Sequence, residues 1–205
     1  MPIIETYVDA FSDPSIDYVV VPSGSCTGAV REQHVRIAER YGSKALADGA
    51  EQTANKTYDL SEFIVDVAGT TDVGAFFPHR VTYHSSCHSR RFIKVGERPK
   101  ELLRNVEGLE LVDLPNEEEC CGFGGTFAVK MPEVSAAMVS DKAMHIKETK
   151  AEYVTAGDSS CLMNIAGAMS RQHNGIRALH MAEILASTKE HPLTPMSAAY
   201  SKEKM

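Results

Sequence analysis

The sequence predicts an α/β fold in which βαβ units surround a mostly parallel sheet. Short apolar runs of strand length recur along the chain. Helical patterns lie between consecutive runs, as they do in βαβ units. The stretch at 17–26 has a near copy at 152–161, which indicates two strand–loop–helix units arranged in tandem.

Five runs have the length and the apolar content of buried strands. They are "IDYVVVP" (16–22), "RVTYH" (80–84), "LELVDL" (109–114), "EYVTAG" (152–157) and "IRALH" (176–180). The main helical patterns are "LSEFIVDVAG" (60–69), "PKELLRNV" (99–106), "PEVSAAMVSDKAMHIKETK" (132–150), "LMNIAGAMSRQ" (162–172) and "MAEILAST" (181–188). Pro132 suits the first turn of the longest helix, and we expect Met131, Met138 and Met144 on or beside it to pack in the core.

Composition narrows the class of protein. The chain has 205 residues, enough for one sizeable domain or two small ones. A net charge of −7 argues against nucleic acid or an anionic membrane as the main partner. No apolar run reaches the length of an integral membrane segment, and the first residues lack the basic region of a secretory signal. Five widely spaced cysteines do not resemble a secreted disulfide scaffold, so a cytoplasmic location is expected.

The cysteines share one position relative to the predicted strands. Each lies in a loop just past the carboxyl end of a strand: Cys26, Cys87, Cys120, Cys121 and Cys161. In an open parallel sheet these ends meet at one edge, where ligands bind. A single cysteine there would be read as a small buried hydrophobe. Five in equivalent loops favour a shared metal or redox site.

Cys120 and Cys121 are neighbours in the sequence. Their Cα atoms are about 3.8 Å apart, whereas an ordinary disulfide needs roughly 4.4 Å or more. Adjacent side chains also reach two corners of one zinc tetrahedron with difficulty. A cluster with several metal atoms is easier to satisfy, because each thiolate can bind a different iron.

The repeat predicts the domain organisation. "DYVVVPSGSC" (17–26) matches "EYVTAGDSSC" (152–161), and the paired cysteines are 161 − 26 = 135 residues apart. Subtracting this offset from the positions of the other cysteines gives numbers below 1, so the first copy is expected to be incomplete. We therefore divide the chain into a remnant of the first unit (1–72), a complete second unit (73–188) and a flexible tail (189–205).

Three segments together resemble the cysteine-rich CCG-domain proteins. They are "HSSC" (84–87), "CCGFGGTFAVK" (120–130) and "DSSCLMNIAG" (158–167). The likeness is greatest to the lactate utilization protein A family of iron–sulfur oxidoreductases and covers about residues 10–188. More distant relatives are the iron–sulfur subunit of glycolate oxidase and one of the subunits of heterodisulfide reductase.

The resemblance implies two tandem CCG units and a metal site in the second. Cys87, Cys120, Cys121 and Cys161 would hold its iron–sulfur cluster, and four thiolates suit a [4Fe–4S] cluster. Cys26 would be the last cysteine of the first unit, whose leading cysteine and CCG segment are missing. Alone, Cys26 cannot hold a cluster.

The glycines of the CCG segment have a predicted role in the same site. Gly122, Gly124 and Gly125 let the backbone come close to the cluster, so that N–H groups point at its sulfides. Asp158 stands where distant relatives carry another cysteine. It is either an oxygen ligand or the N-cap of the following helix, and we favour the cap.

Other polar residues near the predicted site have open roles. His84 could ligate iron, tune the cluster by a hydrogen bond or simply close a strand. For His88 we favour the start of a helix. The cations Arg90, Arg91 and Lys130 could bind a carboxylate or an acidic partner surface, although a solvated role is favoured for each singly.

The resemblance implies a role in L-lactate oxidation to pyruvate. The sequence contains no flavin or nicotinamide motif, so the oxidation needs other subunits of a lactate-oxidation complex. On this interpretation the chain is a subunit of an oxidoreductase complex that relays electrons and helps to form the active site. Two alternatives stay open: a thiol–disulfide reductase like heterodisulfide reductase, and a non-catalytic zinc-binding or scaffold protein.

Overall fold

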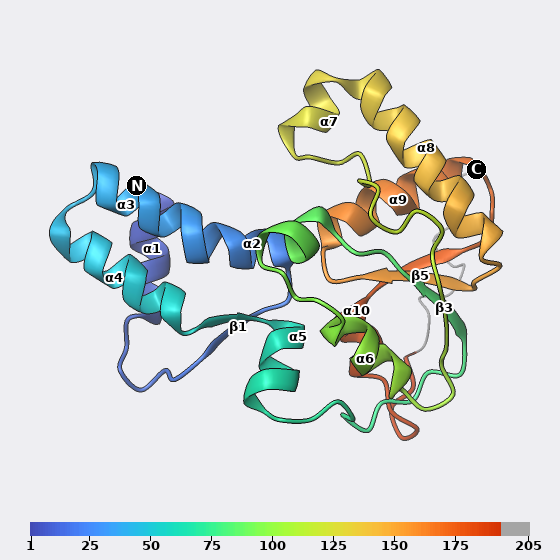
Figure 1. The fold of residues 1–205 in the computed structure, drawn as a ribbon, viewed down its shortest axis with the longest axis horizontal. Helices are drawn as coiled ribbons and strands as arrows, with labels where there is room; N and C mark the ends of the chain where they lie inside the picture. Colours follow the sequence, from blue (N-terminus) through green and yellow to red (C-terminus); the bar gives the residue numbers. More distant parts are fainter. Residues whose placement is uncertain (194–205) are drawn as a thin grey trace, which may run out of the picture.

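The computed structural model describes residues 1–193, which contain two parallel sheets. The small sheet pairs β1 (Val19–Val21) with β2 (Thr57–Asp59). The larger sheet has the order β4-β3-β5-β6, formed by Glu110–Val112, Arg80–Tyr83, Tyr153–Ala156 and Arg177–His180. Every strand pairing in both sheets is parallel, which confirms the predicted α/β class. The two sheets lie side by side along the long axis of the molecule (Figure 1).

All five predicted strands are present, each slightly shorter than its apolar run. The strand β2 was not predicted. Its sequence "TYD" is short and lacks an apolar run, and it becomes a strand only because β1 offers a parallel edge.

Helices cover both faces of the larger sheet (Figure 1). α6 (Arg98–Arg104) and α10 (Met181–Leu185) pack on one face, in a core that includes Val81, Leu103, Tyr153 and Ile184. α8 (Pro132–Glu148) and α9 (Ser159–Arg171) pack on the other, in a core of which Val139, Ile146, Val154 and Ile165 are members. Tyr153 and Val154 serve opposite cores because successive strand residues point to opposite faces.

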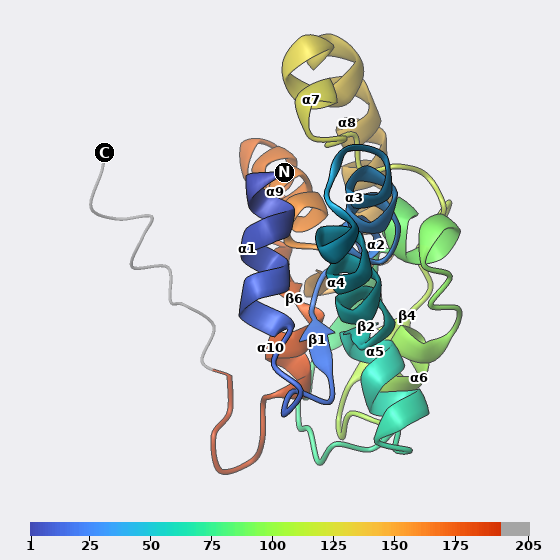
Figure 2. The same cartoon turned by 90° about the vertical axis from the view of Figure 1, so that its left-hand side faces the viewer.

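The first part of the chain is mostly helical and has a small core of its own. α1 (Pro2–Phe11) and α4 (Lys44–Asn55) lie side by side, as Figure 2 shows. α2 (Gly24–Gly28), the π-helical segment η1 (Ala29–His34) and α3 (Val35–Tyr41) follow one another without a loop. Ile4, Ala38, Leu46 and Ala50 are buried among these helices. None of these helices was predicted, although α1 carries apolar residues at helical spacing, such as Ile4, Val8 and Phe11.

The strand–loop–helix pattern occurs twice. β1 leads into α2 as β5 leads into α9, and in both cases the second strand of the pair leads directly into a helix. α5 (Leu60–Glu62), extended by η2 (Phe63–Val67), starts at a capping box of Asp59 and Glu62. α10 starts at a capping box of His180 and Glu183. The division at residue 72 stays a prediction.

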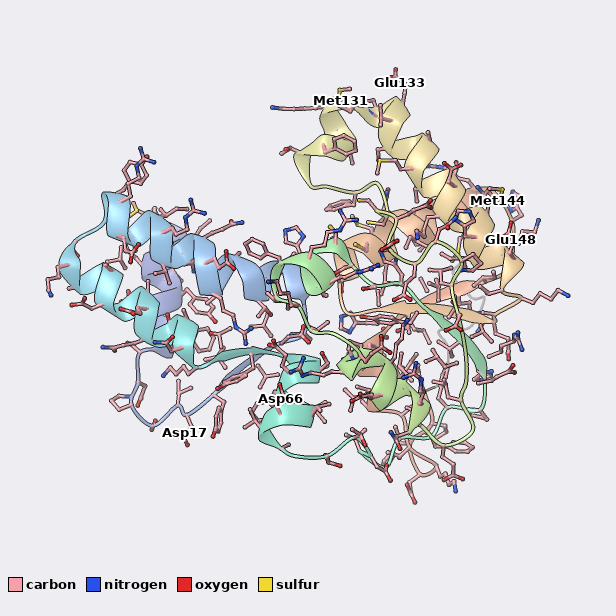
Figure 3. All side chains as sticks on the ribbon, in the orientation of Figure 1. Asp17, Asp66, Met131, Glu133, Met144 and Glu148 are labelled. Atoms are coloured by element: carbon pink, nitrogen blue, oxygen red, sulfur yellow. The ribbon has the colours of Figure 1, made fainter. Side chains whose placement is uncertain are left out.

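The expectation that the methionines on and beside α8 pack in the core is wrong for two of them. Met131 and Met144 are 49% and 50% exposed and do not pack in the core. Both lie on the outer side of the hairpin formed by α7 (Thr126–Lys130) and α8, near Glu133 and Glu148 (Figure 3).

Residues 194–205 of the predicted flexible tail lie outside the described residues. Within residues 1–193, no helix combines the length and the apolar character that a membrane crossing requires.

Candidate metal centre

The carboxyl ends of β3, β4 and β5 bring cysteines from three loops together. Cys121 and Cys161 are buried, and their sulfur atoms are 3.0 Å apart. His84 immediately follows β3, and one of its ring nitrogens lies within 4.8 Å of both sulfurs. These three side chains form a compact group of possible metal ligands.

Cys87 and Cys120 extend this group toward the surface. Both are half-buried, and the thiol of Cys120 lies close enough to the thiols of Cys87 and Cys121 for each of them to shift its pKa. The four sulfurs therefore form a connected series, from half-exposed Cys87 to buried Cys161. One end is shielded from water and the other can be reached from outside.

The CCG segment depends on glycine geometry. Gly122, Gly124 and Gly125 have φ angles of 80°, 52° and 61°, which L side chains rarely adopt. A Cβ on Gly122 would lie 2.6 Å from the carbonyl oxygen of Ser135. The N–H of Gly122 donates to the sulfur of Cys120 at 3.4 Å. The segment thus wraps tightly over the start of α8 and points an amide at a thiol.

Two side chains that sequence reasoning missed hold the CCG segment and the turn before it in place. Asn164 on α9 donates its Nδ2 to the carbonyl oxygen of Cys121 at 2.8 Å. Lys142 on α8 is fully buried, and its Nζ donates to the carbonyl oxygen of Asn116 at 2.6 Å. Burial lowers the pKa of Lys142. The sequence signal that could have revealed this role is the position of Lys142 on the core side of α8, between the buried residues Val139 and Ile146.

The thiols are poorly stabilised as anions by the protein alone. Burial raises the pKa of Cys87, and the hydrogen bond with Cys121, followed by burial, raises that of Cys120. For Cys121 the bond with Cys120 lowers the pKa, but the contact with Cys161 and burial outweigh it, and the pKa rises to about 12. A cationic centre among these sulfurs would supply the missing compensation, because metal-bound thiols lose their protons.

His84 is enclosed without a hydrogen-bond partner. Its side chain is 1% exposed, and neither ring nitrogen has a partner within residues 1–193. Burial, with a smaller effect of Lys142, lowers its pKa to about 3. The imidazole is therefore neutral and keeps a free lone pair, which is the form that binds metals.

Asp158 has a role different from the favoured one. It is the N-cap residue of α9 by position, but its side chain makes no capping hydrogen bond to that helix. Its carboxylate instead accepts from several serines. The donors are Ser25 N–H at 3.0 Å and the hydroxyls of Ser23 (3.2 Å), Ser25 (2.9 Å), Ser86 (3.4 Å) and Ser160 (3.1 Å). The cap interpretation is wrong, and Asp158 joins the loop before α2 to the loop before α9.

The remaining predicted residues lie around the centre. Cys26 is exposed on α2 and is not part of the buried group. η3 starts at His88, as expected, and ends at Phe92. Arg90 forms an ion pair with Glu118 at 2.5 Å, and Arg91 donates to the carbonyl oxygen of Glu118 at 3.2 Å.

The donor set suits a metal ion or a cluster of metal atoms. Four sulfurs and a neutral imidazole exceed the four corners of one tetrahedral site. Thiolates that bind different irons can be neighbours in sequence, as Cys120 and Cys121 are. The ring nitrogens of His84, which have no hydrogen-bond partner within residues 1–193, are a feature that a bound metal group would account for.

Comparisons with known proteins agree with the resemblance seen in the sequence. The family model of the CCG cysteine-rich domain matches residues 81–166. Lactate utilization protein A of Oceanobacillus iheyensis is 47% identical over 174 residues, covering 85% of this chain and 70% of the relative. That of Geobacillus sp. (strain WCH70) is 50% identical over 171 residues, 83% of this chain and 71% of the relative. That of Bacillus subtilis (strain 168) is 43% identical over 184 residues, 90% of this chain and 74% of the relative. With such identity over most of both sequences, the chain belongs to the lactate utilization protein A family.

Proposed function

We propose that this chain is the iron–sulfur protein of an L-lactate utilization system and relays electrons during oxidation of lactate to pyruvate. A [4Fe–4S] cluster would be held by Cys87, Cys120, Cys121 and Cys161. The observation that carries the proposal is the approach of thiols from three separate loops, with 3.0 Å between the sulfurs of Cys121 and Cys161. The name of the relatives supports the lactate system.

The electron balance requires a partner. Oxidation of lactate to pyruvate releases two electrons and two protons, whereas a bound cluster supplies one-electron chemistry. Other subunits of a cytoplasmic lactate-oxidation complex would take both electrons from the substrate. This chain would pass them on one at a time.

The residues of the chain have separate tasks in this relay. The N–H of Gly122, which donates to the sulfur of Cys120, would stabilise the more negative reduced state and raise the reduction potential. Buried Cys121 and Cys161 would keep water from one side of the centre. Half-exposed Cys87 and Cys120 would form the side through which electrons enter or leave.

Anaerobic purification of the full chain tests the proposal against both alternatives. We expect a brown protein with about four iron and four sulfide ions per chain. A colourless protein with one zinc ion would support the scaffold alternative instead. With the partner proteins added, lactate-dependent dye reduction supports the relay. Reduction of a disulfide without a lactate response would favour the thiol–disulfide reductase.

A double variant with a matched control sharpens this test. Cys120→Ser combined with Cys121→Ser should lose iron, sulfide and lactate-dependent dye reduction together. Cys26→Ser removes an exposed thiol outside the buried group and should keep all three. Survival of dye reduction in the double variant would show that the cluster role is wrong.

A further inference from the structure

The buried end of the thiol series has two candidates for a ligand other than cysteine. Asp158 and His84 are both almost completely buried near Cys161. Sequence reasoning left both open as possible ligands. Their hydrogen bonds separate them.

The carboxylate of Asp158 is already occupied. Oδ1 accepts from the hydroxyls of Ser23, Ser25 and Ser160. Oδ2 accepts from the N–H of Ser25 and the hydroxyl of Ser86. A metal bound to Asp158 would have to displace these donors, and the buried hydroxyl of Ser86 would then lose its acceptor at a cost of about 1–3 kcal/mol.

His84 is in the opposite state. Its backbone is anchored, because its N–H donates to the carbonyl oxygen of Thr155 at 2.8 Å. Its ring has no hydrogen-bond partner on either nitrogen within residues 1–193, although the side chain is 1% exposed. Leaving a buried polar group unpaired costs about 1–3 kcal/mol, so such groups call for a partner that completes them. The ring nitrogen lies within 4.8 Å of the sulfurs of Cys121 and Cys161.

We infer that His84 is a nitrogen ligand of the metal centre and binds iron through its ring at the buried end, beside Cys121 and Cys161. The inference rests on the proposed function, since it assumes that the centre contains iron. It would add a fifth protein donor, a neutral one, to an iron that Cys121 or Cys161 also binds. A thiolate in the position of this imidazole would add negative charge to the ligand set, so the imidazole leaves the centre at a higher reduction potential than a thiolate there would.

His88 provides a matched control. It is adjacent to Cys87 and is exposed, with Nδ1 3.7 Å from the sulfur of Cys87. If proximity to a cysteine were enough, His88 would bind as well as His84. The structure encloses only His84 in the buried group of possible ligands found among residues 1–193.

Pulsed electron paramagnetic resonance of the reduced, anaerobically purified full chain tests the inference. With ¹⁵N-labelled histidine, we expect a strong histidine-nitrogen coupling in the wild type and in His88→Asn. The coupling should be absent in His84→Cys. That variant supplies a thiolate in place of the imidazole, so it should keep its iron and show a lower midpoint potential.

The outcomes distinguish this inference from the proposed function. Wild-type protein with iron and sulfide but no strong histidine coupling would overturn the ligand assignment and leave the electron relay standing. A coupling that is lost in His88→Asn would assign the ligand to His88 and would also overturn the assignment to His84. Wild-type protein without iron and sulfide would remove the proposed function itself. If His84→Cys fails to fold, a coupling that persists in His88→Asn still assigns the ligand to another histidine, and His84 is the histidine in the buried group found among residues 1–193.

Discussion

Ser23 and Asp158 are hydrogen-bonded across 135 residues of chain, with the hydroxyl of Ser23 donating to Oδ1 at 3.2 Å. The same offset separates Cys26 from Cys161, so the two residues occupy equivalent positions of the repeat. They are the N-cap residues of α2 and α9. Ser23 also accepts the N–H of Cys26, whereas Asp158 leaves its own helix uncapped by its side chain. The two strand–loop–helix units thus meet at corresponding residues.

Removing the carboxylate of Asp158 should destabilise the protein strongly. Asp158→Ala leaves the donors of four serines without their acceptor; Ser86 is buried and the other three serines are half-buried. We expect the free energy of unfolding to fall by about 2–4 kcal/mol, because a hydrogen bond to a charged acceptor contributes about 1.5–3 kcal/mol and water partly replaces the bonds of the half-buried donors. Chemical denaturation measures the change. Asp141→Ala, at an exposed position of α8, should stay within about 0.5 kcal/mol of the wild type. A loss below about 1 kcal/mol for Asp158→Ala would contradict the role of this network.

Two glycines of the CCG segment should differ in their tolerance of alanine. Both have positive φ, but a Cβ on Gly122 would meet the carbonyl oxygen of Ser135 at 2.6 Å, whereas one on Gly125 has no atom within 4 Å. Gly125→Ala should cost about 1–3 kcal/mol for its backbone conformation, which combines a φ of 61° with a ψ of −117°. Gly122→Ala should cost at least about 3 kcal/mol and lose bound iron, because the backbone itself must move. Thermal unfolding and iron analysis measure the two effects. Equal losses of stability and of bound iron in the two variants would show that the contact of Gly122 with α8 is unimportant.

Lys142 should govern how firmly the segment before Cys120 is held. Lys142→Met keeps most of the side-chain volume but removes the donor to the carbonyl oxygens of Asn116 and Glu117. A charged hydrogen bond contributes about 1.5–3 kcal/mol, so transfer of iron to a chelator should become roughly tenfold faster or more. The absorbance of the cluster reports this rate.

The control for Lys142 is on the same helix. Lys147 is exposed on α8, and Lys147→Met should release iron at the wild-type rate. If both variants behave alike, general loss of positive charge is the cause and the anchoring role of Lys142 is wrong.

His34 should make stability dependent on pH below neutrality. Burial lowers its pKa from the ordinary 6.5, and its Nδ1 is buried with no hydrogen-bond partner in residues 1–193. As the pH falls below 6.5, the unfolded chain binds a proton at His34 before the folded chain does. The contribution of His34 to the free energy of unfolding is therefore fully present above pH 6.5 and is lost as the pH falls toward the lowered pKa of the folded state. The effect is below about 1 kcal/mol because the site is partly solvated.

The variant His34→Phe isolates this term. The ring of His34 lies 5.5 Å from that of Tyr7 in an edge-to-face arrangement, so an aromatic replacement keeps the packing. The free energy of unfolding of the variant, relative to that of the wild type, should rise as the pH is lowered from about 7.5 to about 5.5. An unchanged difference at the two pH values would show that His34 does not titrate with folding.

Much of the fold follows from local pattern. The β-branched run at 16–22 and the apolar run at 152–157 predict strands, and the periodic pattern after Pro132 predicts a helix. Because parallel strands bring their carboxyl ends to one edge, the loop positions of Cys87 and Cys161 already indicated that the two would meet. By contrast, β2 depends on β1 for its edge.

The sequence alone determined the fold class, the strand order in the chain and which residue types could bind a metal. Only the tertiary structure decided the burial and the hydrogen-bond partners of the polar groups near the centre. Asp158 could not be assigned from its neighbours, because four serines compete for its oxygens and two of them lie more than 130 residues away. For His84, the fold buries both ring nitrogens without a hydrogen-bond partner among residues 1–193, which supports the proposed ligand role. Strands and helices form from contacts close in sequence, whereas the state of a buried polar group depends on whichever distant segments the fold packs against it.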